Sequence, residues 1–333
     1  DALPISTMSL SHIMFFYTAL IYMVYLYNNS SCRTKKYGIV AILAFYAVTY
    51  VVFPFRDNSL YFNVADAGQG VFTTISYKGI NMIVDCGSTS NRNMGEYTVV
   101  PYLTKKGINK IDALFISHWD KDHFSGLSDL LDSNIKVKKL FSSEPNEKFN
   151  NVEILSRGHQ MTIDNLKMEI LWPYENLSFN NRNNSSLVIS LSFKDKKILL
   201  PGDIEKEAEY AIYNTIEPHN ILLLPHHGSK TSSTEEFVAA VKPEIALLSY
   251  GRNNYGIPSE EVISRYEKAG SRLLSTYEEG DINFILKDSN LYYNTYTNER
   301  SANYYELFFD GIAFKIVVFC FLVMWVRSEK YEF

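Results

Sequence analysis

A cluster of possible metal ligands lies in the stretch SHWDKDHFSGL, which runs from Ser117 to Leu127. It directly follows a hydrophobic run at 113–116 that is typical of a buried strand. If the loop after that strand wraps round a point, nitrogen and oxygen ligands converge in a combination that suits Zn²⁺ or Mn²⁺. A solvated acidic loop is the alternative, and the mixture of imidazoles with carboxylates disfavours it. The four side chains are His118, Asp120, Asp122 and His123.

Two later stretches offer further ligands for such a site. Asp203 follows a hydrophobic strand and a glycine in LLPGDIEKEAE, and the pair His226 and His227 follows another hydrophobic run in LLLPHHGSKTSS. In a layered α/β protein, loops at the ends of strands can share one edge. A hydrolytic centre with two ions needs more ligands than the first loop supplies, and these stretches are the candidates.

The elements that would position these loops extend from residue 60 to about 296. Strands come first in pairs and then alternate with helices, which predicts an α/β fold with two sheets and helices outside, an αββα sandwich. The dipeptide Lys78–Gly79 predicts a hairpin turn. Strands are expected at 60–64, 71–77, 80–84, 113–117, 137–141, 166–171, 186–193, 196–200, 220–224, 244–249, 272–275 and 282–286. Helices are expected at 99–107, 125–132, 205–215, 233–241 and 259–270.

The composition sets further limits. A chain of 333 residues allows one large domain or two smaller units. The net charge of −5 gives no global electrostatic sign of a nucleic-acid-binding protein. Local basic runs at 105–110 and 136–139 could follow phosphates or could be a solvated face. The three cysteines lie too far apart to indicate a disulfide framework or a metal knuckle.

Both ends of the chain are predicted to enter a membrane. Residues 1–56 contain two uncharged hydrophobic runs, expected as transmembrane helices at about 10–27 and 38–53. The basic loop between them is expected in the cytoplasm, which places the domain at 57–296 outside the cytoplasmic membrane. The tail at 297–333 carries a third expected span at about 311–326, interrupted by Lys315. Buried helices of a soluble protein, or an amphipathic helix at the C-terminus, are the alternatives.

The first six residues, DALPIS, read like the translation of a sequencing-adapter oligonucleotide. We therefore expect that residues 1–6 are not native and that the gene product is longer than this chain.

Nine motifs follow one another within about 60–286: DAGQG, IVDCG, VVPYLTKKGI, LFISHWDKDHFSGL, LWP, NNSSLVISL, LLPGDIEKEAE, PHHGSKTSS and YGIPSEEVI. Their order resembles the metallo-β-lactamase superfamily, and in particular the C-terminal domain of the ComEC family of DNA-uptake channel proteins. Membrane spans before the domain fit the same family. The resemblance implies a metallo-β-lactamase-like αββα sandwich flanked by membrane helices, with one or two divalent ions, Mn²⁺ or Zn²⁺.

The resemblance also implies roles for the ligand candidates. One ion would be held by the first half of the 118–123 motif and a second ion by its other half, with Asp203 as the bridge. Either histidine of the pair at 226–227 would be a ligand or would contact the phosphate and the leaving group. The expected metal ligands are His118, Asp120, Asp122, His123, Asp203 and His226. The expected catalytic residues are Asp122, His226 and His227.

Other residues are expected to support the ligands or to contact the substrate. Asp66 and Asp85 would orient histidine ligands or would be simple turn residues. The loop that contains Asn184 and Ser186 replaces a usual superfamily histidine and is expected to face the site. Ser229 and Lys230 follow the histidine pair and belong to the same supporting set.

Two positions depart from the family pattern. Val71 and Ile257 stand where the family usually has Asp and His, respectively. A missing imidazole weakens one metal position, so the chain is expected to hold one ion, two ions or none.

Three functions follow from these features. The first is a metal-dependent nuclease domain of a DNA-uptake channel, which processes the incoming or single-stranded DNA. Its partners would be the membrane, the remaining channel helices and the DNA-uptake machinery. The second is another metallo-phosphoesterase, for example one that acts on phosphorylcholine groups. The third is a metal-depleted, non-catalytic domain of the channel.

Overall fold

The computed structural model describes residues 58–175, 177 and 179–296. The three predicted membrane spans and the first six residues lie outside this range. Within the described residues, every helix is too short or too polar to cross a bilayer.

The first sheet has eight strands in the order β17-β16-β1-β2-β3-β5-β7-β8. Their bounds are β1 (Leu60–Val64), β2 (Gly70–Tyr77), β3 (Ile80–Ser88), β5 (Ala113–Ile116), β7 (Leu140–Ser142), β8 (Val152–Ile154), β16 (Ile282–Lys287) and β17 (Asn290–Thr295). The strands from β17 to β3 pair antiparallel, and those from β3 to β8 pair parallel. The predicted turn at Lys78–Gly79 joins β2 to β3, and both of its residues have positive φ, as a tight hairpin turn requires.

The second sheet has seven strands in the order β15-β14-β13-β12-β11-β10-β9. They are β9 (Gln160–Ile163), β10 (Leu166–Trp172), β11 (Val188–Phe193), β12 (Lys196–Leu200), β13 (Ile221–Leu223), β14 (Ile245–Leu248) and β15 (Arg272–Ser275). Here β9 to β12 pair antiparallel and β12 to β15 pair parallel. A separate two-stranded sheet joins β4 (Lys110–Ile111) and β6 (Lys136–Val137).

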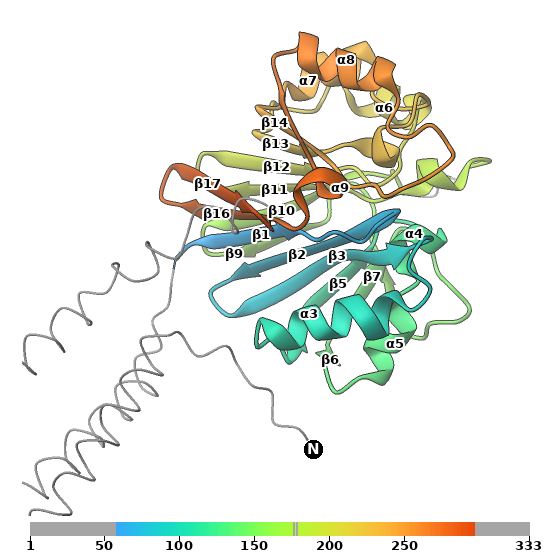
Figure 1. Cartoon of the computed structure of the whole chain (residues 1–333), viewed down its shortest axis with the longest axis vertical. Coiled ribbons are helices and arrows are strands. Elements are labelled where there is room, and N and C mark those ends of the chain that lie inside the picture. Colours follow the sequence, from blue (N-terminus) through green and yellow to red (C-terminus); the bar gives the residue numbers. More distant parts are fainter. Residues whose placement is uncertain (1–57, 176, 178, 297–333) are drawn as a thin grey trace, which may run out of the picture. The chain divides into compact units, whose positions relative to one another are not determined.

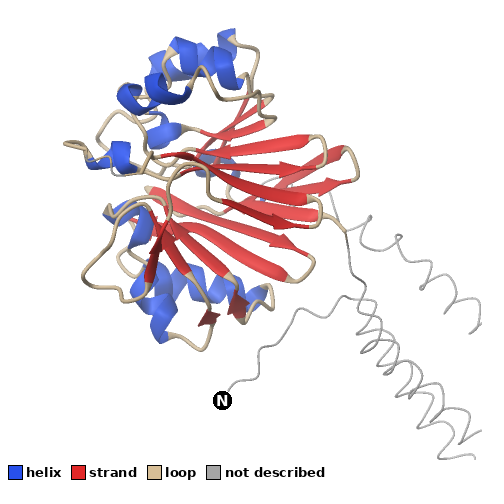
Figure 2. Cartoon of the chain, turned by 180° about the vertical axis from the view of Figure 1, so that it is seen from behind, coloured by secondary structure: helices blue, strands red, loops and turns tan. Residues whose placement is uncertain are grey.

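Helices cover the two outer faces of the sheets, so the layers form the expected αββα sandwich (Figures 1 and 2). The first sheet carries α3 and α5, and the second carries α6, α7 and α8 (Figure 1). The helices are η1 (Gly95–Val99), α3 (Val100–Lys105), α4 (Lys121–Phe124), α5 (Leu127–Asp132), η2 (Arg182–Ser185), α6 (Lys206–Ile212), η3 (Pro225–Gly228), α7 (Glu235–Val241), α8 (Glu260–Lys268) and α9 (Thr276–Glu279).

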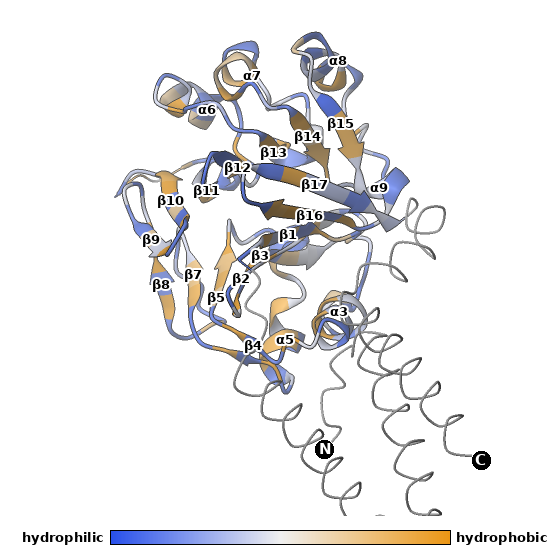
Figure 3. Ribbon diagram, turned by 90° about the vertical axis from the view of Figure 1, so that its left-hand side faces the viewer, coloured by the Kyte–Doolittle hydropathy of each residue, from blue (hydrophilic) through white to orange (hydrophobic). Residues whose placement is uncertain are grey.

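Three hydrophobic layers hold the sandwich together. The central layer lies between the sheets and contains large side chains such as Phe62, Phe115 and Phe193. The other two layers lie between each sheet and its helices. The strands of both sheets accordingly carry most of the hydrophobic colour in Figure 3, whereas the helices are mixed. Burial of hydrophobic surface on both faces of each sheet is the main stabilising contribution.

Most predicted elements are confirmed, and the differences are local. The expected strand at 137–141 is wrong, because β6 ends at Val137 and β7 begins at Leu140 in a different sheet. The structure adds β4, β8, β9, β17 and the short helices α4, α9, η2 and η3, which the sequence pattern did not indicate. All but β17 have only two to four residues, too few for a clear periodic hydrophobic pattern. The six residues of β17, NLYYNT, lack a strict alternation of apolar and polar side chains.

Candidate metal centre

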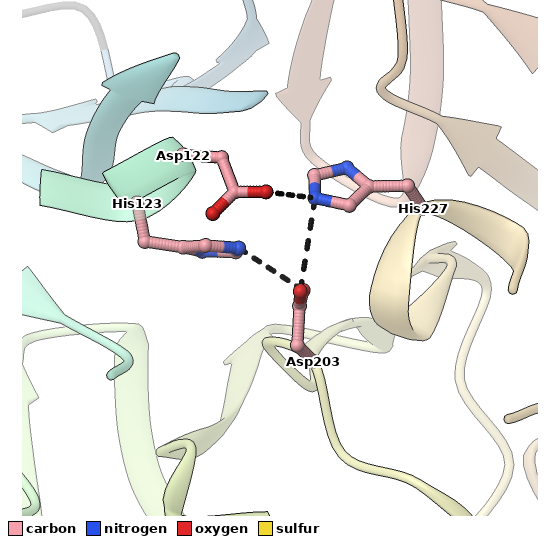
Figure 4. Close-up of side chains that lie close together, drawn as sticks. All are labelled: Asp122, His123, Asp203 and His227. Carbon is pink, nitrogen blue, oxygen red and sulfur yellow. Dashed lines mark ion pairs between the residues drawn. The ribbon is translucent and has the colours of Figure 1, made fainter. Parts of the chain in front are cut away.

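Four side chains from both halves of the sandwich converge at one edge of the sheets (Figure 4). Asp122 and His123 lie on α4, directly after β5; Asp203 follows β12; and His227 lies on η3, after β13. One possible ligand atom from each lies within 4.8 Å of those of the other three. The loops that precede these residues all follow the carboxyl ends of strands in the parallel parts of the two sheets, which is why residues so distant in sequence meet.

The distances between these atoms suit a metal centre. His123 Nε2 lies 3.1 Å from Asp203 Oδ1, and His227 Nε2 lies 3.4 Å from Asp122 Oδ2 and 3.7 Å from Asp203 Oδ2. Metal–ligand bonds of about 2.0–2.2 Å place neighbouring ligands roughly 3–3.6 Å apart. The four residues therefore fit a divalent ion with nitrogen and oxygen ligands.

The hydrogen bonds of the two imidazoles support the same conclusion. His227 Nδ1 lies 2.7 Å from the carbonyl oxygen of Ser249, and His123 Nδ1 lies 2.8 Å from Asp85 Oδ2. Both partners are acceptors, so each Nδ1 carries the proton and donates it. The two Nε2 atoms are buried and make no hydrogen bond with any described residue. Buried nitrogens without a partner are costly in a folded protein, and a bound metal ion would satisfy them.

Asp85 is placed by an irregularity in β3. The register between β2 and β3 shifts at this point, so Cys86 pairs with Phe72 and Val84 with Thr73. Asp85 is left over as a bulge with a left-handed φ of 58°. Its carboxylate accepts hydrogen bonds from the Ser117 backbone N–H and hydroxyl as well as from His123. The bulge therefore directs a buried carboxylate at the loop that carries the ligands, where it orients His123.

Close backbone approaches explain the local sequence. A Cβ atom on Gly87 would lie 2.4 Å from the backbone nitrogen of His123, so only glycine lets β3 pack against the start of α4. His226 and His227 have left-handed φ values of 49° and 53°, which non-glycine residues adopt at a cost. This strained turn at the end of β13 directs the His227 ring into the centre.

The charges of the metal-free centre favour a cation. Burial raises the pKa of Asp122, but its contact with His227 and the charge of His123 outweigh burial and lower this pKa to about 2. Burial likewise acts against ionisation of Asp203, but the neighbouring histidines hold its pKa well below the usual range. Burial lowers the pKa of His123 and of His227, but the carboxylates reverse this effect and raise both. A metal ion would take the place of the protons that these two imidazoles hold.

His118 and Asp120, two of the predicted ligands, lie beside this group and not within it. His118 is fully buried, and its Nδ1 lies 3.2 Å from the hydroxyls of Ser117 and Ser186. Its Nε2 makes no hydrogen bond with the described residues and lies 3.7 Å from Asp120 Oδ2. Burial, followed by the charge of His123, lowers the pKa of His118 to about 4, so the ring is neutral. The other oxygen of Asp120 accepts a hydrogen bond from Arg182 Nη1 at 3.0 Å.

The structure separates the two adjacent histidines. His227 belongs to the group of four, whereas His226 Nε2 is 4.0 Å from Asp203 Oδ2 and its side chain is 22% exposed. His226 Nδ1 lies 3.3 Å from Glu205 Oε1 and 3.5 Å from Asn183 Nδ2. We expected His226 among the ligands, but the group of four contains His227 instead. The turn at 226–227 directs the two rings to different sides.

The other residues that were expected to support the ligands or contact the substrate have different surroundings. Asp66 is a turn residue, because its Oδ1 accepts from the Gly68 backbone, whereas Asp85 orients His123. Ser186 contacts both His118 and the Asp203 backbone N–H, so this residue lies next to the centre.

The side chains of three others bind residues outside the group of four or are exposed. The Asn184 side chain binds Glu207 and the Glu205 backbone N–H and so supports the start of α6. Ser229 is buried beside Thr231, and Lys230 is exposed.

The two departures from the family pattern have different surroundings. Val71 is buried in the central hydrophobic layer. Ile257 lies on a loop that packs against the His227 turn, since the Ser259 N–H donates to the Gly228 carbonyl oxygen.

The basic runs at 105–110 and 136–139 lie away from the centre. They include β4 and β6, which come just before the amino ends of β5 and β7, whereas the centre lies at the carboxyl ends. Lys110 and Lys138 there both pair with Asp112.

Sequence reasoning missed three residues that act here. Ser117 and Ser249 directly follow the carboxyl ends of β5 and β14. Their position at strand ends on the same edge as the ligand loops could have indicated them from the sequence. Arg182 gave no signal, because its contact with Asp120 joins loops 62 residues apart.

Comparison with known proteins agrees with this geometry. Residues 65–252 match the family described as "Metallo-beta-lactamase superfamily". The chain is 31% identical over 268 residues to ComE operon protein 3 of Bacillus subtilis, which covers 71% of this chain and 34% of that protein. It is 32% identical over 219 residues to Recombination protein 2 of Haemophilus influenzae, with 65% and 28% covered.

The chain thus spans about a third of the length of these relatives. Among solved structures it is similar to Igni18, a metallo hydrolase from Ignicoccus hospitalis, with 15% identity and a TM-score of 0.45 over 67% of this chain and 98% of that one. The relatives confirm the resemblance to the ComEC family of competence proteins. The match over more than half of its length, together with the fold, means that this chain belongs to the metallo-β-lactamase superfamily.

Proposed function

We propose that this domain is a metal-dependent phosphodiesterase that cleaves DNA as part of a membrane DNA-uptake protein. The observation that carries the proposal is the group Asp122, His123, Asp203 and His227, with two buried imidazole Nε2 atoms that make no hydrogen bond with the described residues and lie beside carboxylates. A divalent ion bound there lowers the pKa of a bound water and polarises a phosphoryl oxygen.

The chain's own residues supply the rest of the chemistry. Asp85 and the Ser249 carbonyl fix the two imidazole rings, so the centre is organised before a substrate arrives. His226 is the part-exposed histidine beside the ligands, with Glu205 next to its Nδ1. It is therefore placed to hold or transfer a proton at the leaving-group oxygen.

The choice of DNA as substrate rests on the relatives. One is named a recombination protein and another, 29% identical and from Neisseria gonorrhoeae, a competence protein. The hydrophobic ends of the sequence and the basic loop between the first two runs support a location in the cytoplasmic membrane with this domain outside.

Substrate preference tests the proposal directly. The purified domain is incubated with Mn²⁺ or Zn²⁺ and offered a single-stranded oligonucleotide, bis(p-nitrophenyl) phosphate or p-nitrophenylphosphorylcholine. Cleavage of the oligonucleotide is expected. Activity on the phosphorylcholine ester alone would replace the nuclease by another phosphoesterase, and a domain that binds no metal would be a non-catalytic channel component.

The variant Asp122→Ala gives an independent test. It removes one ligand of the group, so metal binding and hydrolysis should be lost together. Asp66→Ala is the matched control, since Asp66 is an exposed carboxylate in a turn. An Asp122→Ala variant that hydrolyses at the wild-type rate with one equivalent of metal would refute the proposed centre.

The predicted topology can be measured with one cysteine. Ser289 is exposed on the turn between β16 and β17, whereas Cys86 is buried. In a Cys32→Ser, Cys320→Ser background, Ser289→Cys should react with a membrane-impermeant maleimide in intact cells. Protection until the cells are lysed would place the domain in the cytoplasm.

A further inference from the structure

The 118–123 loop carries two halves with different surroundings. One half, Asp122 and His123, joins the group of four ligands. The other half, His118 and Asp120, contains one buried imidazole, whose Nε2 makes no hydrogen bond with the described residues, and one carboxylate that is 39% exposed. A second metal ion would have to bind at this other half.

The described residues leave that second position short of ligands. Ser186 Oγ is already bonded to His118 Nδ1 and the Asp203 N–H, and the Asn184 amide is bonded to Glu207 and Glu205. Ile257 has no donor atom on its side chain. A catalytic divalent ion usually has three or more ligands from the protein. Both oxygens of Asp203 already face His123 Nε2 and His227 Nε2, so His118 and Asp120 together do not provide a complete second site.

A cation already lies at this position. Arg182 Nη1 donates to Asp120 Oδ1 at 3.0 Å, while Asp120 Oδ2 faces His118 Nε2 at 3.7 Å. The Arg182 side chain is 61% exposed, so the guanidinium lies at the rim of the centre and is open to solvent. It has five N–H donors, and this contact uses one of them.

We propose that the centre binds a single divalent ion and that Arg182 takes the place of a second ion as the cation that binds the substrate phosphate. Asp120 is then not a ligand but the residue that positions the Arg182 guanidinium. An exposed ion pair is weak, so a phosphate can share or take over the guanidinium, whose planar fork suits phosphate oxygens. This inference rests on the proposed phosphodiesterase function.

Metal stoichiometry tests the first half without any measurement of activity. Native mass spectrometry of the wild-type chain with excess Mn²⁺ or Zn²⁺ should show one ion. Asp120→Asn should also hold one ion, with an affinity within about threefold of wild type. Two ions in the wild type, or a lost ion in Asp120→Asn, would overturn the inference while leaving the phosphodiesterase intact; no bound ion at all would instead remove the proposed function.

Kinetics and phosphate binding test the second half. Arg182→Ala should raise the KM for bis(p-nitrophenyl) phosphate about tenfold or more, as expected for a lost charge-assisted contact, while one ion stays bound. Arg182→Lys should recover part of this loss. Lys139→Ala, which removes the cation of the exposed pair with Glu153, is the matched control and should leave KM unchanged. Inorganic phosphate should also bind more weakly to zinc-loaded Arg182→Ala. An unchanged KM and phosphate affinity in that variant would overturn the assignment.

Discussion

Two buried histidines lie at opposite ends of strand β13, and their hydrogen bonds distinguish a structural imidazole from a candidate metal ligand. His219, just before β13, has both nitrogens occupied: Nδ1 lies 2.7 Å from the Glu217 carbonyl oxygen and Nε2 lies 2.8 Å from Ser190 Oγ. His227, just after β13, uses its Nδ1 in the same way, but its Nε2 makes no hydrogen bond with the described residues and faces carboxylate oxygens of Asp122 and Asp203 at 3.4 and 3.7 Å. Burial alone therefore does not indicate a metal ligand, whereas a buried Nε2 that lacks a hydrogen bond and lies next to carboxylates marks a candidate ligand.

The largest expected effect tests that distinction within the histidine pair. His227→Ala should weaken metal binding by more than about 100-fold, because it removes a ligand whose orientation is fixed. His226→Ala should keep the metal and lose turnover. Isothermal titration calorimetry and single-turnover kinetics measure the two effects. The comparison fails if both variants bind metal equally well.

A smaller effect is expected from Asp85, which orients His123 without joining the group. Asp85→Asn should weaken metal binding by about 10–100-fold, the usual range for a residue that orients a ligand. Asp66→Asn should leave it unchanged, since Asp66 accepts from the Gly68 backbone in a turn. Competition with a chelator for Zn²⁺ gives both constants. Equal affinities for the two variants would show that the bulge in β3 does not serve the centre.

His219 is expected to make the free energy of unfolding depend on pH in the acidic range. Burial lowers its pKa to about 4, below the value of about 6.5 expected in the unfolded chain. The stability that the neutral ring contributes is therefore complete above about pH 6.5 and is lost as the pH falls towards 4. When the pH falls from 7 to 4.5, the free energy of unfolding should decrease in both metal-free proteins. The decrease should be about 1–2 kcal/mol smaller in His219→Gln than in the wild type, because the variant has no imidazole to protonate. Urea titrations at both pH values measure this, and equal losses would contradict it.

The smallest effect is expected at Ile257, whose loop packs against the His227 turn. Ile257→His supplies an imidazole where the family usually has one, so metal affinity should rise several-fold or a second, weaker ion should bind. Ile257→Leu is the control without a donor atom. Calorimetry with Mn²⁺ and Zn²⁺ is the measurement. Identical stoichiometry and affinity in both variants would mean that position 257 does not face the centre.

Local pattern was sufficient for most of the fold. The alternation of buried and part-exposed residues in β10, from Leu166 to Trp172, can be read from the sequence because it depends only on the period of the strand. The turn at Lys78–Gly79 is similarly local. By contrast, the segment 137–141 looks like one strand, and its division between two sheets depends on which neighbours each half meets.

The sequence by itself determined the kinds of ligand and the loops that carry them. Each loop follows a hydrophobic strand, and the order of the motifs resembles one family. Only the tertiary structure separates residues that look alike in the sequence: His227 joins the group of four and His226 does not, and Asp85 contacts His123 whereas Asp66 does not. It also brings Arg182 to Asp120. The physical reason is that the direction of a side chain depends on contacts with distant segments. His227 is aimed by the Ser249 carbonyl, 22 residues away, and Asp85 by a bulge whose carboxylate meets Ser117, 32 residues away.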